Sequence, residues 1–130
     1  MKLHLLKVLC LLFVLNQNTV SFSQNAVKGI YHLVNNPSDA PNSPGDELPI
    51  YLYKASIELR WLNKLKCTSI DLPTDSVSVW RGKWSLSGKT IQLEFQVKGV
   101  LEIRMFEIVK LKSGNYIKPV NDYFHYYKKE

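Results

Sequence analysis

The second half of the chain is a series of short runs of alternating apolar and polar residues, and this pattern most constrains the fold. The runs cover residues 77–86, 91–97, 101–111, 116–120 and 123–127. Glycine, asparagine, aspartate and serine residues separate the runs, and these residues favour turns. Short strands at intervals of roughly 8–12 residues are typical of an antiparallel meander that closes as a barrel or a sandwich. The sequence therefore predicts an all-β domain.

The clearest hairpin is predicted around Gly88-Lys89. A glycine at the first central position is what a two-residue type II′ turn requires. Such a turn aligns four pairs of residues across the two strands: Leu86 with Ile91, Trp84 with Leu93, Gly82 with Phe95, and Lys83 with Glu94. One face of this ribbon is then entirely apolar, with Gly82 leaving space for the Phe95 ring. We predict that this face points into the domain.

The following hairpin, around Lys98-Gly99-Val100, allows two registers. A three-residue loop keeps one face apolar, because it aligns Phe95 with Ile103, Leu93 with Met105 and Glu94 with Arg104. A two-residue loop instead aligns Phe95 with Glu102 and Leu93 with Arg104, which a one-sided core would not tolerate. We therefore predict the three-residue loop, with Met105 inside. In this register Phe106 would point to the opposite face from Ile103 and Met105, although it is apolar too. A bulge near Met105-Phe106, which would bring Phe106 back to the inner face, is therefore predicted.

Three earlier segments are interpreted separately. Residues 29–34 are predicted to form the first strand. Residues 50–66 fit a strand through alternation at positions 55, 57, 59 and 61, and their β-branched and aromatic content favours this. A short helix over 52–60 is the competing interpretation. Residues 35–49 contain four prolines, which preclude a regular helix or central strand. We interpret them as a disordered loop, or alternatively as a lid or partner-binding loop.

The N-terminus has the layout of a secretory signal peptide over residues 1–23. Lys2 and Lys7 make the start of the chain basic, and a short apolar run over 8–15 follows them. Ser21 and Ser23 then place small residues at positions −3 and −1 of a cleavage site before Gln24. This run is too short to span a bilayer, which takes roughly 20 apolar residues. A buried core helix is the alternative. We expect cleavage before Gln24, a single mature domain over 24–130 without a stable membrane span, and a periplasmic or secreted protein.

The composition of the expected mature chain limits its partners and its redox chemistry. Cleavage leaves 15 basic and 11 acidic residues, a net charge of +4. Because acidic residues are interleaved with the basic ones, we expect no nucleic-acid partner. Cys67 becomes the only cysteine, so the domain has no internal disulfide. We interpret Cys67 as a small buried hydrophobe, with a reactive thiol or a disulfide-linked dimer as the alternatives.

Groups suited to catalysis are sparse in this sequence. His32 and His125 lie on the predicted first and last strands, which are neighbours in a closed barrel, but two imidazoles fall short of a zinc site. Four glutamates, at positions 58, 94, 102 and 107, alternate with apolar residues and are expected on a solvated face. No glycine-rich phosphate loop occurs. We therefore expect no catalytic residues, no metal and no cofactor.

The hairpin motif Gly82-x-Trp84-x-Leu86-x-Gly88-x-x-Ile91-x-Leu93 resembles that of the small bacterial lipocalin-like (calycin) domains. The resemblance extends over roughly residues 27–128. It implies an exported or envelope β-barrel that binds a ligand in its interior. The chain departs from the lipocalins proper at the first strand, where they carry Gly-x-Trp and this sequence has Gly29-Ile30-Tyr31.

Two main hypotheses for function follow from these observations. The first is a barrel that binds an apolar or aromatic small ligand non-covalently, since ligand pockets are mainly apolar. Its candidate ligand-binding residues lie on the predicted inner face: Trp80, Trp84, Leu93, Phe95 and Met105. The second is a protein-interaction module, such as a secreted inhibitor or envelope-assembly factor, because the tyrosine-rich sequence suits protein recognition. A hydrolase is a weaker third hypothesis, which requires His32, His125 or Cys67 to share a cleft with a carboxylate.

Overall fold

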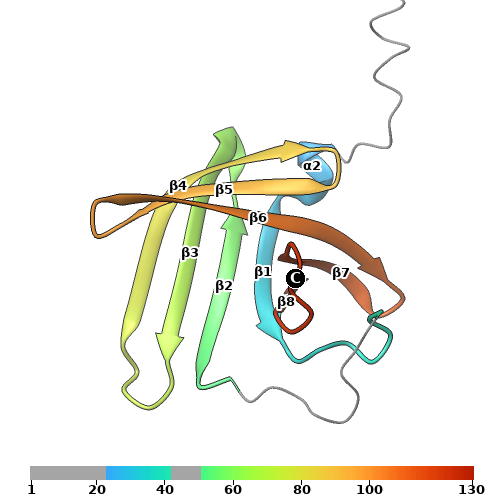
Figure 1. Ribbon diagram of the computed structural model, residues 1–130, viewed down its shortest axis with the longest axis horizontal. Coiled ribbons are helices and arrows are strands. Elements are labelled where there is room, and N and C mark those ends of the chain that lie inside the picture. The colour runs from blue at the N-terminus through green and yellow to red at the C-terminus, as the bar shows by residue number, and fades with distance from the viewer. Residues whose placement is uncertain (1–22, 42–50) are drawn as a thin grey trace, which may run out of the picture.

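Eight antiparallel strands form a closed barrel in the computed structural model, which describes residues 23–41 and 51–130 (Figure 1). Each strand pairs with its neighbours in sequence, and β1 pairs with β8 to close the ring. The strands are β1 (Gly29–Val34), β2 (Tyr53–Leu59), β3 (Lys64–Asp71), β4 (Val77–Ser87), β5 (Thr90–Val97), β6 (Val100–Leu111), β7 (Gly114–Pro119) and β8 (Tyr126–Lys129). The predicted all-β meander is confirmed, and it closes as a barrel. Except for Ser23, the predicted signal peptide lies outside the described residues.

Of the segment 50–66, residues 53–59 are confirmed as the strand β2 and residues 64–66 begin β3, whereas the competing helix over 52–60 is wrong. Ile57 of β2 pairs with Tyr31 of β1, while Leu59 pairs with Leu65 of β3, so β2 is held on both sides. The alternation ends at Leu59, because the short 3₁₀ helix η1 (Trp61–Asn63) turns the chain into β3. Trp61, which the alternation placed on the same face as Leu59, is instead 73% exposed.

The hairpin between β4 and β5 has the predicted register. Gly88 has a φ of 61°, as the first central residue of a type II′ turn requires. Trp84 pairs with Leu93 and Gly82 pairs with Phe95. The reason for the glycine differs from the prediction. A Cβ atom at Gly82 would lie 1.8 Å from the carbonyl oxygen of Glu94, so the β5 backbone, rather than the Phe95 ring, occupies the space.

The predicted register between β5 and β6 is wrong. The strands are joined by the two-residue turn Lys98-Gly99, in which both residues have positive φ angles of 51° and 78°, as in a type I′ turn. Phe95 therefore pairs with Glu102, and Leu93 pairs with Arg104. Pairing continues without a break to the Thr90–Glu107 pair, so the predicted bulge near Met105-Phe106 is absent from this ladder.

This register reverses the two faces over the first half of β6. Leu101, Ile103 and Met105 lie on the outer face and are 58%, 54% and 42% exposed. Glu102 and Arg104 lie in the inward phase, which Phe106 continues. The inward charges are tolerated because this part of the interior is not a closed core. It is a cavity, and both charged side chains keep contact with water.

One end of the barrel interior is filled with side chains. Trp84 is 2% exposed and belongs to a cluster that also contains Leu59, Leu65 and Ile91. The short helix α2 (Gln24–Val27) lies at this end and adds Val27 to the cluster, while the Tyr31 hydroxyl donates to the Val27 carbonyl. Among the described residues, no helix is long and apolar enough to cross a bilayer.

A second, smaller cluster lies outside the barrel ring. Tyr116 of β7 and Tyr126 of β8 pack edge to face, with ring centroids 6.0 Å apart, beneath Ala40. The Asn36 side chain donates to the Tyr123 carbonyl at 2.8 Å. The described part of the proline-rich segment, residues 35–41, therefore packs on the barrel, whereas residues 42–50 lie outside the described residues.

β8 begins three residues later than the predicted run over 123–127. The Asp122 carboxylate accepts hydrogen bonds from the backbone N–H groups of Phe124 and His125, at 2.7 and 2.9 Å. These bonds hold the chain in a turn, and Tyr126 is the first residue of the strand. The turn places His125 immediately before β8, beside the cavity described below.

Candidate functional site

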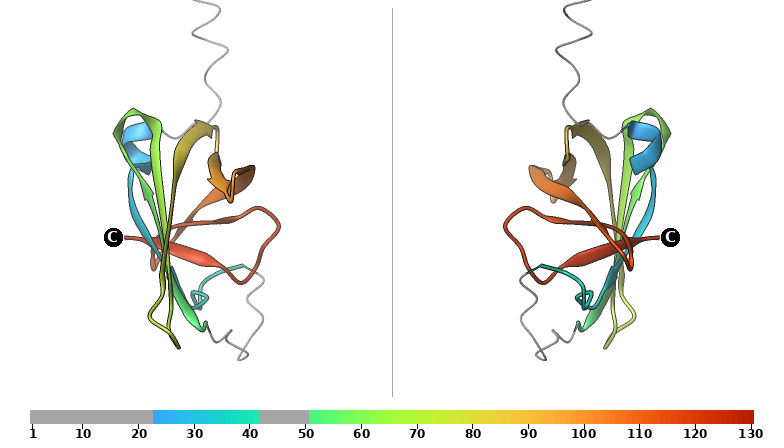
Figure 2. Two further views of the ribbon diagram at one scale, coloured as in Figure 1. Left: turned by 90° about the vertical axis from the view of Figure 1, so that its left-hand side faces the viewer. Right: turned by 90° about the vertical axis from the view of Figure 1, so that its right-hand side faces the viewer.

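A cavity of about 290 Å³ occupies the half of the interior away from Trp84. Figure 2 shows the β5–β6 hairpin standing across the interior from β2 and β3, and side chains from these strands form the walls. The residues that line the cavity come from β2 to β6 and from β8: Tyr53, Ala55, Ser56, Ile57, Cys67, Thr68, Ser69, Trp80, Leu93, Phe95, Val97, Glu102, Arg104, Phe106 and Tyr127.

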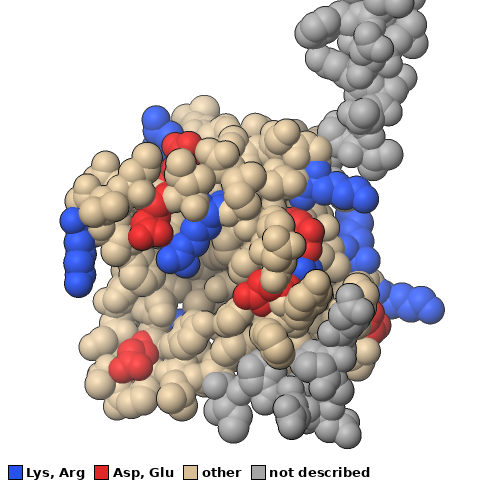
Figure 3. Space-filling model, in the orientation of Figure 1, with Lys and Arg blue, Asp and Glu red and all other residues tan. Residues whose placement is uncertain are grey.

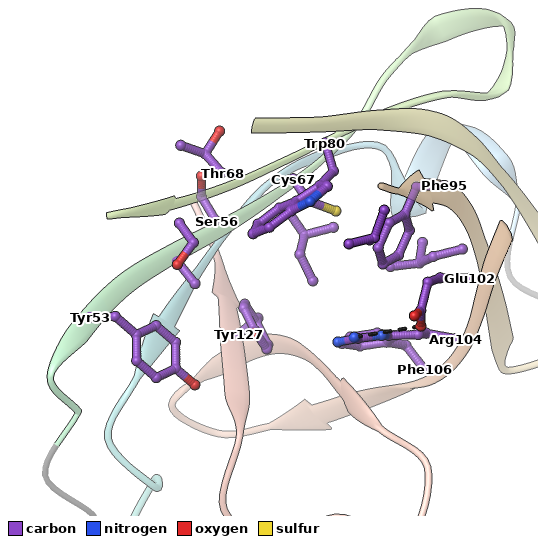
Figure 4. Close-up of a pocket in the computed structure, with 15 residues that line it drawn as sticks. Tyr53, Ser56, Cys67, Thr68, Trp80, Phe95, Glu102, Arg104, Phe106 and Tyr127 are labelled. Carbon is purple, nitrogen blue, oxygen red and sulfur yellow. Dashed lines mark ion pairs between the residues drawn. The ribbon is translucent and has the colours of Figure 1, made fainter. Parts of the chain in front are cut away.

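Aromatic side chains make up much of the cavity wall. Figure 4 shows Trp80, Phe95, Phe106 and Tyr127 around one space, with Tyr53 at its edge. The rings of Phe106 and Tyr127 contact each other edge to face, with centroids 5.9 Å apart and an interplanar angle of 69°. Such contacts hold the rings in fixed orientations. The wall is therefore suited to contact a flat apolar group.

Two charged side chains enter this aromatic surface from β6. Nη2 of Arg104 lies 3.8 Å from Oε2 of Glu102, which makes a long ion pair (Figure 4). The guanidinium carbon of Arg104 lies 5.5 Å from the centroid of the Phe95 ring, within the range of a cation–π contact. Arg104 and Glu102 alternate with Leu101, Ile103 and Met105, so the inward phase of β6 places both charges in the cavity.

A second hollow, of about 440 Å³, adjoins the first. It shares Tyr53, Arg104, Phe106 and Tyr127 with the interior cavity and extends to His125. Arg104 therefore lies at the junction of the two spaces. Figure 3 shows this face of the molecule hollowed, with basic and acidic side chains at the rim.

Asp122 and His125 form a pair in the second hollow. Nδ1 of His125 lies 2.8 Å from Oδ2 of Asp122. Burial alone would raise the pKa of Asp122, but the backbone N–H groups of Phe124 and His125 and the His125 ring outweigh this effect and lower it. The Asp122 carboxylate is thus ionised and already hydrogen-bonded, so its main role in the structure is to hold the turn before β8.

Cys67 contributes a thiol to the cavity wall. Burial raises its pKa to about 11, and the positive charge of Arg104 offsets only part of this effect. Since the thiolate is the reactive form of cysteine, the thiol is unreactive near neutral pH. Burial likewise raises the pKa of the Tyr127 hydroxyl, which is neutral over the same range. The interpretation of Cys67 as a small, largely buried hydrophobe agrees with this setting.

The predicted inner-face residues divide into three groups. Trp80, Leu93 and Phe95 line the cavity as expected. Trp84 also points inward, but it fills the closed end and does not line the cavity. Met105 is placed wrongly by the prediction: it lies in the outward phase of β6 and borders only the second hollow. The error has one cause, the two-residue turn at Lys98-Gly99, which shifts β6 by one residue relative to the prediction.

Because of the same register error, the prediction did not place the polar residues of the site in the cavity. Glu102, predicted on a solvated face, lines the cavity, as do Arg104 and Phe106. The only local signal was Gly99, which suits the second central position of a type I′ turn, whereas Lys98 takes a φ of 51° that L side chains rarely adopt. Tyr53 and Tyr127 belong to the tyrosine-rich part of the composition, but no sequence pattern indicates that β2 and β8 meet the same space.

The two histidines do not meet. Nε2 of His32 lies 2.8 Å from Oε1 of Glu130 on the outer face of β1, whereas His125 pairs with Asp122 in the second hollow. Within residues 23–41 and 51–130, no group of three or more histidine, cysteine, aspartate or glutamate side chains gathers in a way that would hold a metal ion.

A wider groove lies at the opposite end, between α2 and η1. Its volume is about 740 Å³, and its walls include Lys28, Arg60 and Trp61. Trp61 and Leu62 are strongly exposed there, and the groove is more open to solvent than the interior cavity is. We therefore take the interior cavity as the candidate site.

No family model, curated protein or solved structure matches this chain.

Proposed function

We propose that this protein is an exported β-barrel that binds a small apolar or aromatic ligand non-covalently in its interior cavity. The observation that carries the proposal is the space of about 290 Å³ among Trp80, Phe95, Phe106 and Tyr127. Protein interiors are normally packed with few voids larger than a water molecule. A hollow of this size, close to the lower end of ligand pockets at roughly 300 Å³, is best explained by an occupant.

Two further observations support parts of this proposal. The closed meander of eight strands agrees with the resemblance to lipocalin-like domains, although a barrel fold by itself does not fix a function. Export rests on the signal-peptide layout over residues 1–23. We propose binding without chemistry on the ligand, because burial keeps the Cys67 thiol of the cavity wall protonated near neutral pH.

A cavity-filling variant tests the binding site. We expect the protein to bind naphthalene-2-carboxylate or its neutral analogue naphthalene-2-carboxamide with one-to-one stoichiometry in isothermal titration calorimetry. Ala55→Phe places a ring in the cavity and is expected to weaken binding at least tenfold. Lys54→Phe adds the same ring at the adjacent, exposed position of β2 and serves as the matched control. Failure of both compounds to bind, or equal binding by the two variants, would contradict the proposal.

The second candidate function, a protein-interaction module, is favoured by one observation. Leu101, Ile103 and Met105 form an exposed apolar row on the outer face of β6, and apolar surface of this kind marks contact sites when it is continuous. The row consists of a single strand, whose neighbours on β5 are the polar residues Gln92, Glu94 and Gln96. It is therefore narrower than the surface that a stable complex normally buries.

Native mass spectrometry of the protein purified from its own host distinguishes the two candidates and tests export. We expect a chain that begins at Gln24 and retains a small molecule. A stoichiometric protein partner that is lost from Ile103→Glu, with no retained small molecule, would favour the second candidate. A chain that keeps residues 1–23 would contradict export.

A further inference from the structure

We infer that the ligand is an organic carboxylate, whose apolar body lies against the aromatic wall while Arg104 binds its carboxylate group. This inference rests on the proposed function and specifies the chemical class of the ligand.

The position of Arg104 is the first argument. Its side chain lines both adjoining hollows, so it stands where a molecule seated against Trp80 would reach the second space. The guanidinium lies beside the Phe95 ring at 5.5 Å. A flat apolar group on the aromatic wall would therefore have a cationic group at its outer end. This arrangement suits a ligand with an apolar part and an anionic part.

The hydrogen-bonding capacity of Arg104 is the second argument. A guanidinium has five N–H donors in a planar fork, which matches the two oxygens of a carboxylate. Among the described residues, its ion-pair partner is Glu102, and their closest atoms are 3.8 Å apart, beyond hydrogen-bond distance. Donors of Arg104 are thus available to a ligand carboxylate that approaches through the cavity.

The register of β6 is the third argument. A strand shifted by one residue would turn Leu101, Ile103 and Met105 inward and remove Arg104 from the cavity wall. The observed register does the opposite, and leaves these three apolar side chains exposed. Burial of apolar surface would favour the shifted arrangement. A polar, partly charged cavity wall is therefore better explained by what it binds than by what it contributes to stability.

The cavity wall carries one positive and one negative side chain, Arg104 and Glu102, and the preference for an anion depends on which of them meets the ligand. The positive charge of Arg104 offsets a small part of the rise that burial causes in the pKa values of Cys67 and Tyr127, so Arg104 lies near both of these groups. Glu102 is the nearest competitor for the guanidinium, and its side chain is 41% exposed, so it can turn to water when a ligand carboxylate binds. Asp122 is already hydrogen-bonded within its own turn.

Two nearly isosteric compounds that differ in charge test this inference. We expect naphthalene-2-carboxylate to bind at least about tenfold more tightly than naphthalene-2-carboxamide in calorimetry at low salt, because charged hydrogen bonds are the stronger ones. Arg104→Gln is expected to remove this preference, so that the ratio of the two affinities falls to about one. Arg104→Lys keeps the charge without the planar fork and should retain part of the preference.

Glu102→Gln is expected to increase the preference for the carboxylate, whereas Arg104→Gln removes it. Because this change removes a competing carboxylate, we expect it to tighten binding of naphthalene-2-carboxylate several-fold relative to binding of the amide. Arg81→Gln removes a positive charge from the outer phase of β4 and is the matched control, with no expected effect on either compound. Circular dichroism confirms that each variant is folded.

The possible outcomes separate the inference from the function on which it rests. Equal affinity for the two compounds, a preference that survives in Arg104→Gln, or weaker carboxylate binding in Glu102→Gln overturns the inference. Binding of the amide alone overturns it too. If the wild-type protein binds neither compound, the proposed function fails as well.

Discussion

Replacing Trp84 with alanine is expected to lower the free energy of unfolding by about 3–5 kcal/mol. Trp84 is 2% exposed and lies at the centre of the cluster that fills the closed end of the barrel. Its indole Nε1 donates to the Arg60 carbonyl at 3.0 Å, so the change also leaves that oxygen without its partner. Since small domains are stable by only about 5–15 kcal/mol, the loss is a large fraction of the total. Urea denaturation followed by circular dichroism measures it.

Trp61→Ala is the matched control for this prediction. It removes the same side chain from a surface position, where the indole contacts the Lys28 side chain. A surface substitution of this kind changes the free energy of unfolding by about 0.5 kcal/mol or less. Similar losses in the two variants would mean that Trp84 is not the centre of the core.

Gly82→Ala is expected to destabilise the protein by about 3 kcal/mol, at the upper end for overpacking, although it adds only one methyl group. The added Cβ would lie 1.8 Å from the Glu94 carbonyl oxygen and 3.0 Å from the Cα atom of Phe95. Both neighbours are backbone atoms of β5, so a side-chain rotation cannot make room. The two strands would have to separate at the centre of the barrel. Thermal unfolding and urea denaturation of the variant measure this effect.

Gly88→Ala is the control that distinguishes the destabilisation due to crowding, as at Gly82, from the destabilisation due to a positive φ angle. Gly88 has a positive φ of 61°, but an added Cβ atom would have nothing within 4 Å. The change should therefore destabilise by about 1–2 kcal/mol, the usual effect of placing an L side chain in the left-handed region. A larger loss at Gly88 than at Gly82 would contradict the close approach of β4 and β5.

The hairpin between β4 and β5 could be predicted in full because its determinants are local. Gly88 selects the turn, and the alternation of Trp84 and Leu86 with polar residues selects the face. Both are read from a few consecutive residues. The strand over 53–59 was predicted for the same reason, since its β-branched and aromatic residues alternate.

The hairpin between β5 and β6 could not be predicted by the same reasoning. The requirement that one face of the hairpin be entirely apolar favoured the register that buries Ile103 and Met105. This requirement assumes that every inward position lies in a closed core. In the structure, β6 passes a cavity, so Glu102 and Arg104 point inward and remain hydrated. Gly99 suits the observed turn but Lys98 does not, so the turn residues gave little guidance against the preference for apolar burial.

The sequence by itself determined the strands and most turns of this protein, because alternation and turn chemistry act between neighbouring residues. Only the tertiary structure decided which half of the barrel is filled and which half is left as a cavity. That outcome depends on the pairing of β1 with β8, on α2 at one end and on the inward phase of β6. These contacts join residues far apart in the chain. The same contacts decide that Arg104 faces the aromatic wall, and no local pattern carries that information.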